Sequence, residues 1–300
     1  MINIKQDIKD FALGTGIDLC GVSGVERFAE SPEGRHPCDI LPGCKSVIVI
    51  GVKLLDGVVQ ANFRAFEDGR RDLKAIYGTY GYAMLPNFEL TYACYALARY
   101  IERSTGEVAT PCSTGPMTNG VQLSIRHAAV AAGLGEIGWT GLLLSPEFGA
   151  RNRFGVVLTT LELEQDPLYS GAPLCNPEKC GVCVKVCPVD ALSKYGEEPC
   201  NSFSMDGKEA VYCKTNINKC QIATLGLTKK LGGRDDYIFT DDPTAADIFE
   251  AQERVPIGQA GLQHVDSWHC GKCQSYCPAG GWAERFKKTG LSSGAMQHNK

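Results

Sequence analysis

The sequence predicts a mixed α/β (α+β) fold whose second half is rich in cysteine. Three observations support this prediction. Residues 46–53 (Ser-Val-Ile-Val-Ile-Gly-Val-Lys) are apolar and mostly β-branched, which is typical of a buried central strand. Residues 86–103 repeat apolar side chains near the helical period, at Phe88, Leu90, Cys94, Leu97 and Ile101. Two similar cysteine strings follow residue 166.

The other elements of residues 1–166 alternate between the same two periodicities. Helical spacing predicts helices in residues 2–13 and 122–132, and short apolar runs predict strands in residues 17–23, 142–145 and 151–160. Residues 62–82 mix charges with tyrosines, which favours a solvated helix followed by a turn. Residues 111–116 (Pro-Cys-Ser-Thr-Gly-Pro) predict a turn. We interpret the isolated cysteines of this half, Cys38, Cys44, Cys94 and Cys112, as packed thiols.

The two cysteine strings share one motif. The first runs from Cys175 to Pro188 and the second from Cys270 to Pro278, and both contain C-G-x-C-x₃-C-P. This is most of the bacterial ferredoxin run C-x₂-C-x₂-C-x₃-C-P, in which three cysteines bind one cluster and the cysteine before proline binds the other. The strings therefore predict two [4Fe–4S] clusters in a ferredoxin-like module over residues 167–290. An insertion at residues 195–266 interrupts this module, and residues 291–300 look like a flexible tail.

Each string lacks the usual first cysteine, because position 177 is a proline and position 267 a serine. Cys175 is the natural substitute in the first string. For the second string we favour Cys220, with Cys213 next and Cys200 a distant third. The predicted ligands of one cluster are Cys175, Cys180, Cys183 and Cys277. Those of the other cluster are Cys187, Cys220, Cys270 and Cys273. The alternative metal is zinc, whose sites pair two C-x₂-C units without the trailing C-x₃-C-P.

Composition limits the class of protein. The chain of 300 residues is 44% hydrophobic and can bury a sizeable core. Its formal net charge of −4 gives no global basic footprint, which weakens a nucleic-acid substrate although a local basic face would be compatible with it. No apolar run reaches the roughly 18 residues of a membrane span. Fifteen cysteines without an export signal favour thiolates in a reducing cytoplasm.

Residues 133–141 form a glycine-rich loop. Gly133, Gly135 and Gly138 satisfy G-x-G-x-x-G, but they follow a predicted helix and precede a predicted strand, the reverse of a dinucleotide-binding turn. We reject that function and expect the loop backbone to approach either a packed helix or a flat cofactor. Arg151 and Arg153 open the next strand, where they are surface charges or bind the acidic or amide periphery of a cofactor.

Residues 126–155 (Arg-His-Ala-Ala-Val-Ala-Ala-Gly-Leu-Gly-Glu-Ile-Gly-Trp-Thr-Gly-Leu-Leu-Leu-Ser-Pro-Glu-Phe-Gly-Ala-Arg-Asn-Arg-Phe-Gly), followed by the double cluster motif, resemble a known group. They look like the epoxyqueuosine reductase and reductive dehalogenase superfamily. The phrases Gly-Leu-Gly-Glu and Ser-Pro-Glu-Phe-Gly are closer to the dehalogenases. The chain length and the absence of an export signal are closer to the queuosine enzymes.

The resemblance implies a nitroreductase-like domain over residues 1–166 that holds base-off cobalamin. Two clusters would feed this corrinoid with electrons from a low-potential donor such as ferredoxin or flavodoxin. The loop residues Gly133, Gly135, Glu136 and Gly138 would lie against the corrin, with Arg151 and Arg153 as further cofactor contacts. Flavin in the same fold is a less favoured alternative.

The sequence departs from the queuosine enzymes at their proton donor. Their D-T-[GA]-P turn is Ser113-Thr-Gly-Pro116 here, and serine is a poor acid near neutrality. Tyr80 and Tyr82 are substitute candidates, because a phenol can donate a proton. We therefore hypothesise reduction of a small or nucleoside-like substrate other than the tRNA base. The alternative is an electron-transfer protein that serves a partner without substrate chemistry.

Overall fold

The computed structural model describes residues 3–82, 84–112, 123–227, 238–253 and 270–281. Its centre is a four-stranded antiparallel sheet in the order β1-β2-β6-β3. The strands are β1 (Leu19–Gly24), β2 (Ser46–Lys53), β6 (Asn152–Thr159) and β3 (Ala109–Cys112). The inner position of β2 confirms the central buried strand that residues 46–53 predict. Because all four strands are antiparallel to their neighbours, the fold is of the α+β kind.

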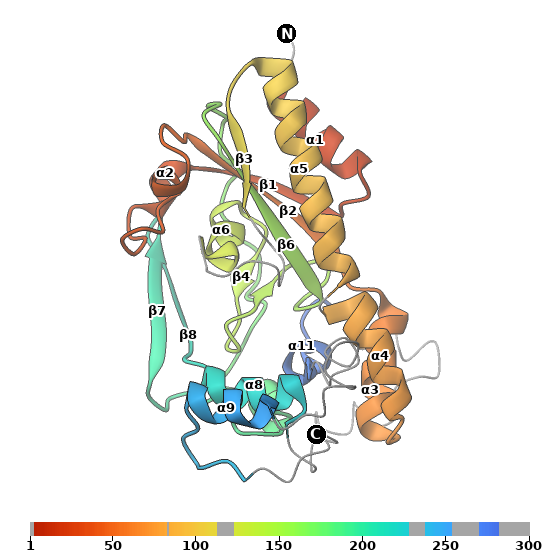
Figure 1. The fold of residues 1–300 in the computed structure, drawn as a ribbon. Helices are drawn as coiled ribbons and strands as arrows, with labels where there is room; N and C mark the ends of the chain where they lie inside the picture. The colour runs from red at the N-terminus through yellow and green to blue at the C-terminus, as the bar shows by residue number, and fades with distance from the viewer. Residues whose placement is uncertain (1–2, 83, 113–122, 228–237, 254–269, 282–300) are drawn as a thin grey trace.

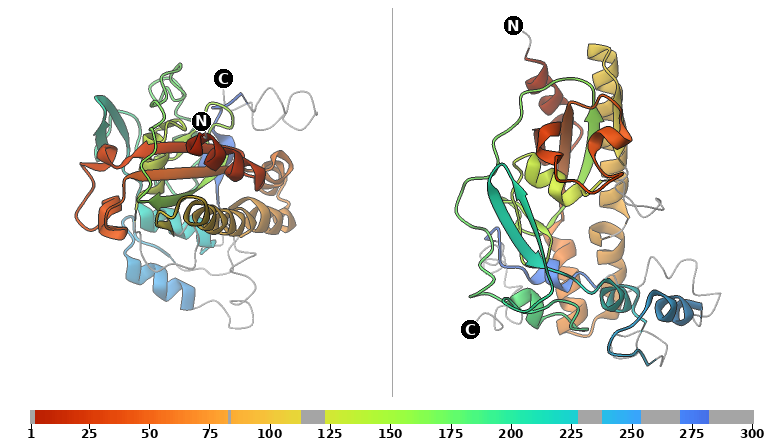
Figure 2. Two further views of the ribbon diagram at one scale, coloured as in Figure 1. Left: turned by 90° about the horizontal axis from the view of Figure 1, so that it is seen from above. Right: turned by 90° about the vertical axis from the view of Figure 1, so that its left-hand side faces the viewer.

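Helices cover both faces of the sheet, which explains why β2 is apolar at consecutive positions. Val47 and Val49 face a core that includes the alanines of α6 (Ile125–Ala131). Ile48 and Ile50 face the opposite core, built on α1 (Ile4–Gly14) and α5 (Leu85–Thr105). All four side chains are fully buried. Figures 1 and 2 show α5 running along the sheet with α1 beside it.

The segment before residue 113 differs from its prediction. Pro111 and Cys112 belong to strand β3 and pair with Val157 and Val156 of β6, so the prediction of a turn is wrong for these two residues. A proline is tolerated here because β3 is an edge strand, whose outer N–H groups have no ladder partner. Residues 113–116 lie outside the described part of the chain.

Residues 56–82 form a compact helical unit and not a solvated helix. The unit comprises α3 (Asp56–Glu67), η2 (Arg71–Leu73), α4 (Lys74–Tyr77) and the π-helix η3 (Gly78–Tyr82). Val59 and Phe63 of α3 are buried against the cysteine-rich half, and Lys74 and Tyr77 are buried as well. The prediction of a mainly solvated segment is therefore wrong, because the cysteine-rich half covers this unit.

The cysteine-rich half wraps around one end of the sheet domain. It contains α7 (Val182–Lys185), β7 (Cys200–Met205), β8 (Lys208–Cys213), α8 (Ile217–Leu225), α9 (Ala245–Glu253) and α11 (Lys272–Tyr276). The hairpin β7–β8 extends toward α2 (Pro37–Ile40), and Asp206 at its turn binds Arg27 of η1 (Val25–Phe28) at 2.6 Å (Figure 1). Within the described residues, no helix has the length and apolar character that a bilayer crossing requires.

Candidate iron–sulfur site

The two cysteine strings meet through their short helices. Val182 is the first residue of α7 and Val186 directly follows its last. Both side chains belong to one apolar cluster with Tyr276 of α11 and with residues of α3. Gly181 and Gly271 precede the two helices with φ of 60° and 54°, the left-handed conformation that glycine adopts most easily. The glycine of C-G-x-C therefore turns the chain from the first cysteine of the motif into the helix that carries the second.

One set of cysteines, the first thiol group, surrounds a small cavity. All four of its members line this cavity together with Gly138, Trp139 and Leu144. Burial, followed by the charges of its neighbours in the group, raises the pKa of Cys183 to about 12. The group consists of Cys175, Cys180, Cys183 and Cys277.

A second set of cysteines, the second thiol group, adjoins the first. Burial is the main reason why the pKa of Cys273 lies well above its usual value. The charges of Cys270, Cys220 and Cys187 raise this pKa as well. Cys220 of α8 interacts in turn with Cys187. The charge of Cys183, a member of the first thiol group, also raises the pKa of Cys273, so the two groups are neighbours. The second thiol group consists of Cys187, Cys220, Cys270 and Cys273.

The two alternative ligands, Cys213 and Cys200, belong to neither thiol group. Cys213 is 1% exposed and packs beside Trp139 and Leu192, where its sulfur accepts the Ser193 N–H at 3.1 Å. Cys200 lies opposite it in the β7–β8 ladder. In the described part of the chain, no three or more His, Cys, Asp or Glu side chains are grouped so that they could hold a single metal ion.

Buried polar side chains of the sheet domain hold the second string in place. Arg151, 2% exposed, donates to the carbonyls of Cys277 at 2.9 Å and Ala279 at 2.7 Å. Asn62 donates to the carbonyl of Cys270 at 3.2 Å and to Ser275 Oγ at 2.9 Å. These contacts fix the backbone that carries three cysteines of the second string. The sequence pattern predicted no role for Asn62, because only the fold brings it to residues more than 200 positions away.

Gln274 completes this polar support from the string itself. It is buried, accepts from the Tyr77 hydroxyl at 3.2 Å and donates to the carbonyl of Ala150 at 2.8 Å. Tyr77 also lies against Gly271, where a Cβ atom would collide with the phenol oxygen. Gln274 stands where the first string has Val184, and this polar residue directly after Cys273 was the one sequence signal that could have indicated the contact.

Glu136, predicted as a cofactor contact, binds the loop of the first string. Its Oε1 accepts from the backbone N–H groups of Leu174 and, at 3.0 Å, Cys175. The Trp139 N–H donates to Cys175 Sγ at 3.4 Å, and the Ala191 N–H donates to Cys187 Sγ at 3.2 Å. Backbone N–H groups directed at cysteine sulfurs stabilise thiolates and tune iron–sulfur centres.

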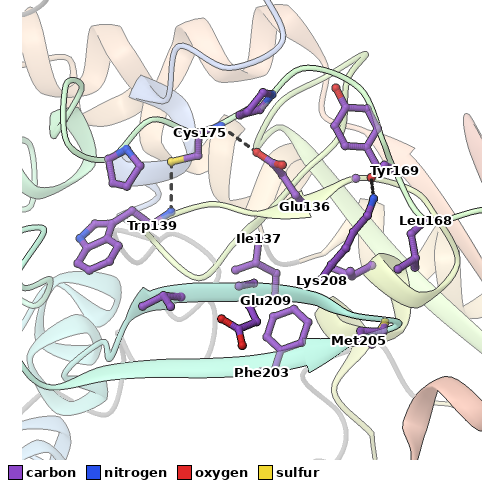
Figure 3. A pocket seen from close by; sticks show the side chains of 16 residues that line it. Glu136, Ile137, Trp139, Leu168, Tyr169, Cys175, Phe203, Met205, Lys208 and Glu209 are labelled. Atoms are coloured by element: carbon purple, nitrogen blue, oxygen red, sulfur yellow. Dashed lines mark hydrogen bonds between the residues drawn. The ribbon is translucent and has the colours of Figure 1, made fainter.

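A pocket of about 240 Å³ lies beside Cys175 (Figure 3). Strand β4 (Glu136–Ile137), residues 168–177 and the hairpin β7–β8 form its walls, with Phe203 and Met205 among the apolar lining. Lys208 on the rim donates to the carbonyl of Tyr169. Pockets for drug-sized ligands run from about 300 to 1,000 Å³, so this one is too small for a corrin ring.

The glycine loop is covered by the chain itself. A Cβ atom on Gly133 would collide with the carbonyl of Pro167, and one on Gly135 with the carbonyl of Leu144. A Cβ on Gly138 would meet the Leu144 side chain. Of the two expected purposes of the loop, close packing against the chain explains these glycines. Contact of this loop with a cofactor stays a prediction.

The remaining predicted site residues are only partly placed. Arg153 is half-buried at the start of β6. The Tyr80 side chain on η3 is 51% exposed. Ser113 and the side chain of Tyr82 lie outside what the structure describes, so their role as proton donors stays a prediction. The prediction of packed thiols is confirmed for Cys44, Cys94 and Cys112, which are buried. Cys38 is half-buried and packs against the core that contains Cys44.

Sequence comparisons agree with the cysteine pattern. Residues 178–193 match the family model of the 4Fe-4S binding domain. An epoxyqueuosine reductase of Staphylococcus aureus is 27% identical over 225 residues, covering 67% of this chain and 56% of that protein. A tetrachloroethene reductive dehalogenase of Dehalobacter restrictus is 30% identical over 192 residues, covering 63% of this chain and 30% of that protein. The chain thus spans about half or less of these relatives.

Solved structures show the same likeness in fold. The epoxyqueuosine reductase of Streptococcus thermophilus superimposes with a TM-score of 0.53 and 20% identity, over 93% of this chain and 66% of that one. A catabolic reductive dehalogenase superimposes with a TM-score of 0.52 and 18% identity, over 86% of this chain and 35% of that one. The chain thus carries a match to the 4Fe-4S binding domain and resembles epoxyqueuosine reductases and reductive dehalogenases in sequence and in fold.

Proposed function

We propose that the protein is an iron–sulfur oxidoreductase that conducts low-potential electrons through two [4Fe–4S] clusters. One observation carries the proposal: the eight cysteines of the motif set fall into two thiol groups of four, and each group takes ligands from both strings. A cubane cluster needs one thiolate at each iron, and crossed ligation is the pattern of two-cluster ferredoxins. The close approach of Cys183 to Cys273 then gives electrons a short path between the clusters.

The chain's own residues prepare both sites. Glu136 holds the Cys175 loop, and the Trp139 and Ala191 N–H groups stabilise sulfurs of one group each. Arg151 fixes the backbone at Cys277. Burial of the thiols keeps water away from the iron, and solvent exposure is one of the factors that set a cluster's potential.

We further propose a corrinoid as the acceptor of these electrons, supported by the resemblance of residues 126–155 to cobalamin-dependent reductases. When bound, cobalamin would supply the reductive chemistry at cobalt. Gly133, Gly135, Glu136 and Gly138 stay candidate corrin contacts in this proposal, and Gly135 and Glu136 line the pocket beside Cys175. The substrate class is a small or nucleoside-like molecule, and the donor class is a ferredoxin or flavodoxin.

A second function has its own support. The packed glycine loop and the small pocket beside Cys175 favour an electron-transfer protein that passes electrons to a partner and reduces no substrate itself. In that function the sheet domain serves as a scaffold for the clusters and for docking. Cobalt binding distinguishes the two functions.

The test is metal analysis after anaerobic purification and incubation with hydroxocobalamin. Two clusters give about eight irons per chain. Near-stoichiometric cobalt that survives gel filtration supports the corrinoid reductase, and a panel of chlorinated and nucleoside substrates with a titanium(III) reductant then identifies its reaction. Full iron without cobalt leaves the electron-transfer function. A chain reconstituted with iron and sulfide that holds fewer than four irons overturns both.

A further inference from the structure

Two cations are buried in the part of the chain that the structure describes, and both face the second cysteine string. Arg151 and Lys74 are each 2% exposed. Arg151 donates to the carbonyl of Cys277, a member of the first thiol group. Lys74 lies on the other side, near Cys270 of the second thiol group. Burial lowers the pKa of Lys74 to about 7, and negative charge at Cys270 opposes this and favours the ammonium form. The sheet domain thus directs one buried cation toward each group.

Lys74 is held by contacts that suit an ammonium ion. Its Nζ donates to Asn62 Oδ1 at 2.6 Å, and the same amide donates to the carbonyl of Cys270 at 3.2 Å. The Nζ also lies 4.0 Å from the ring centre of Phe66 and 5.4 Å from that of Tyr77. Aromatic faces attract cations, and Asn62 links this one to the backbone of a cluster ligand.

The placement has a direct electrostatic consequence. A cluster with four thiolates is an anion, and reduction adds one more negative charge to it. A buried cation therefore stabilises the reduced form more than the oxidised form, and the low polarity of the surroundings strengthens this effect compared with water. Net charge and burial are among the factors that set the potential of such a cluster.

We propose that Lys74 raises the reduction potential of the cluster in the second thiol group and so makes its reduced form easier to reach. The proposal rests on the proposed function, since it requires that cluster to be present. Lys74 acts through space and through Asn62, and it binds no iron. Its role is to place a positive charge near the cluster, so its loss should shift the reduction potential and leave the iron ligands intact.

The experiment is a redox titration followed by electron paramagnetic resonance on the anaerobic full-length protein, comparing wild type with Lys74→Met, Lys74→Arg and Lys45→Met. The Lys45 side chain is 56% exposed and pairs with Glu162, so Lys45→Met removes a solvent-exposed cation in place of a buried one. Iron analysis of the wild type comes first. If the wild type holds no second cluster, the proposed function fails, and that result is separate from any shift caused by Lys74.

With both clusters present, we expect Lys74→Met to make one midpoint more negative and to leave the other in place. At the wild-type midpoint, the ratio of reduced to oxidised cluster should fall at least tenfold, which is 59 mV for a one-electron couple. Lys74→Arg should restore most of the shift, and Lys45→Met should match wild type. Introducing Lys74→Met into a Cys183→Ala background assigns the moving midpoint to the second thiol group.

Three results overturn the proposal. The first is a Lys74→Met protein with full iron and unchanged midpoints. The second is an equal shift in Lys45→Met. The third concerns Lys74→Gln, a second neutral variant that keeps an amide donor for Asn62: if both neutral variants lose iron and Lys74→Arg keeps it, the charge serves cluster assembly and not potential.

Discussion

The crossed ligation of the two clusters can be tested by combining pairs of cysteine variants. Cys187 lies in the first string, yet the structure places it in the second thiol group with Cys220 and Cys270. Removing Cys187 should therefore abolish one cluster, and iron should fall from about eight to about four per chain. A second substitution in the same group should then remove no further iron.

The expected iron contents follow from membership of the groups. Cys187→Ala combined with Cys270→Ala should keep about four irons, because both changes affect one cluster. Cys187→Ala combined with Cys183→Ala should keep about none, because each change removes a different cluster. The iron content of the double variants therefore shows whether two cysteines bind the same cluster or different clusters. The spectra of the two clusters need not be assigned for this test.

The assay is iron and sulfide analysis with electron paramagnetic resonance of the reduced protein, on samples reconstituted in parallel. Cys213→Ala is the matched control. Cys213 is buried beside Trp139 in a cluster that contacts cysteines of both groups, but it is a member of neither, so the variant should keep about eight irons. The reasoning is refuted if Cys187→Ala with Cys270→Ala holds no iron while Cys187→Ala with Cys183→Ala holds four. Loss of a cluster in Cys213→Ala and retention of both in Cys220→Ala would transfer the ligand role to Cys213.

Three further predictions concern single residues. Glu136→Leu should speed iron release to a chelator about tenfold relative to Glu136→Gln, because it removes the acceptor of the Cys175 N–H; equal rates would contradict this. Burial tends to raise the pKa of Asp166, but Lys5 and Lys9 lower it overall. Its ion pairs therefore stabilise the fold above about pH 4. At pH 7 the melting temperature of wild type should exceed that of Asp166→Asn, and this difference should disappear as the pH falls through the lowered pKa of Asp166. A difference that stays constant with pH would contradict the prediction. Burial raises the pKa of Cys94 to about 12, about three units above a free thiol, so alkylation at pH 8 followed by peptide mapping should modify it about a thousandfold more slowly in the native than in the denatured chain, and similar rates would refute this protection.

Local sequence patterns predicted the elements that depend on few neighbours. The β-branched run at residues 46–53 became β2 with the same bounds, because its side chains must be buried on both faces wherever the strand lies. The long periodic helix became α5 within two residues at either end. The prediction for residues 62–82 failed at Lys74 and Tyr77, because a lysine and a tyrosine in a charged segment look solvated until another part of the chain covers them.

The sequence by itself determined that this protein has two cysteine motifs with the chemistry of iron–sulfur ligands, because thiolate spacing is a local property of a loop. The ferredoxin pattern also predicted how the two strings share their cysteines between two groups. Only the tertiary structure decided which cations and amides support these cysteines. Asn62 and Ser275 are 213 residues apart, and no local periodicity records such a contact. The fold also decided that Glu136 and the glycine loop serve packing around the thiols, since backbone carbonyls and N–H groups, which every sequence shares, are their partners.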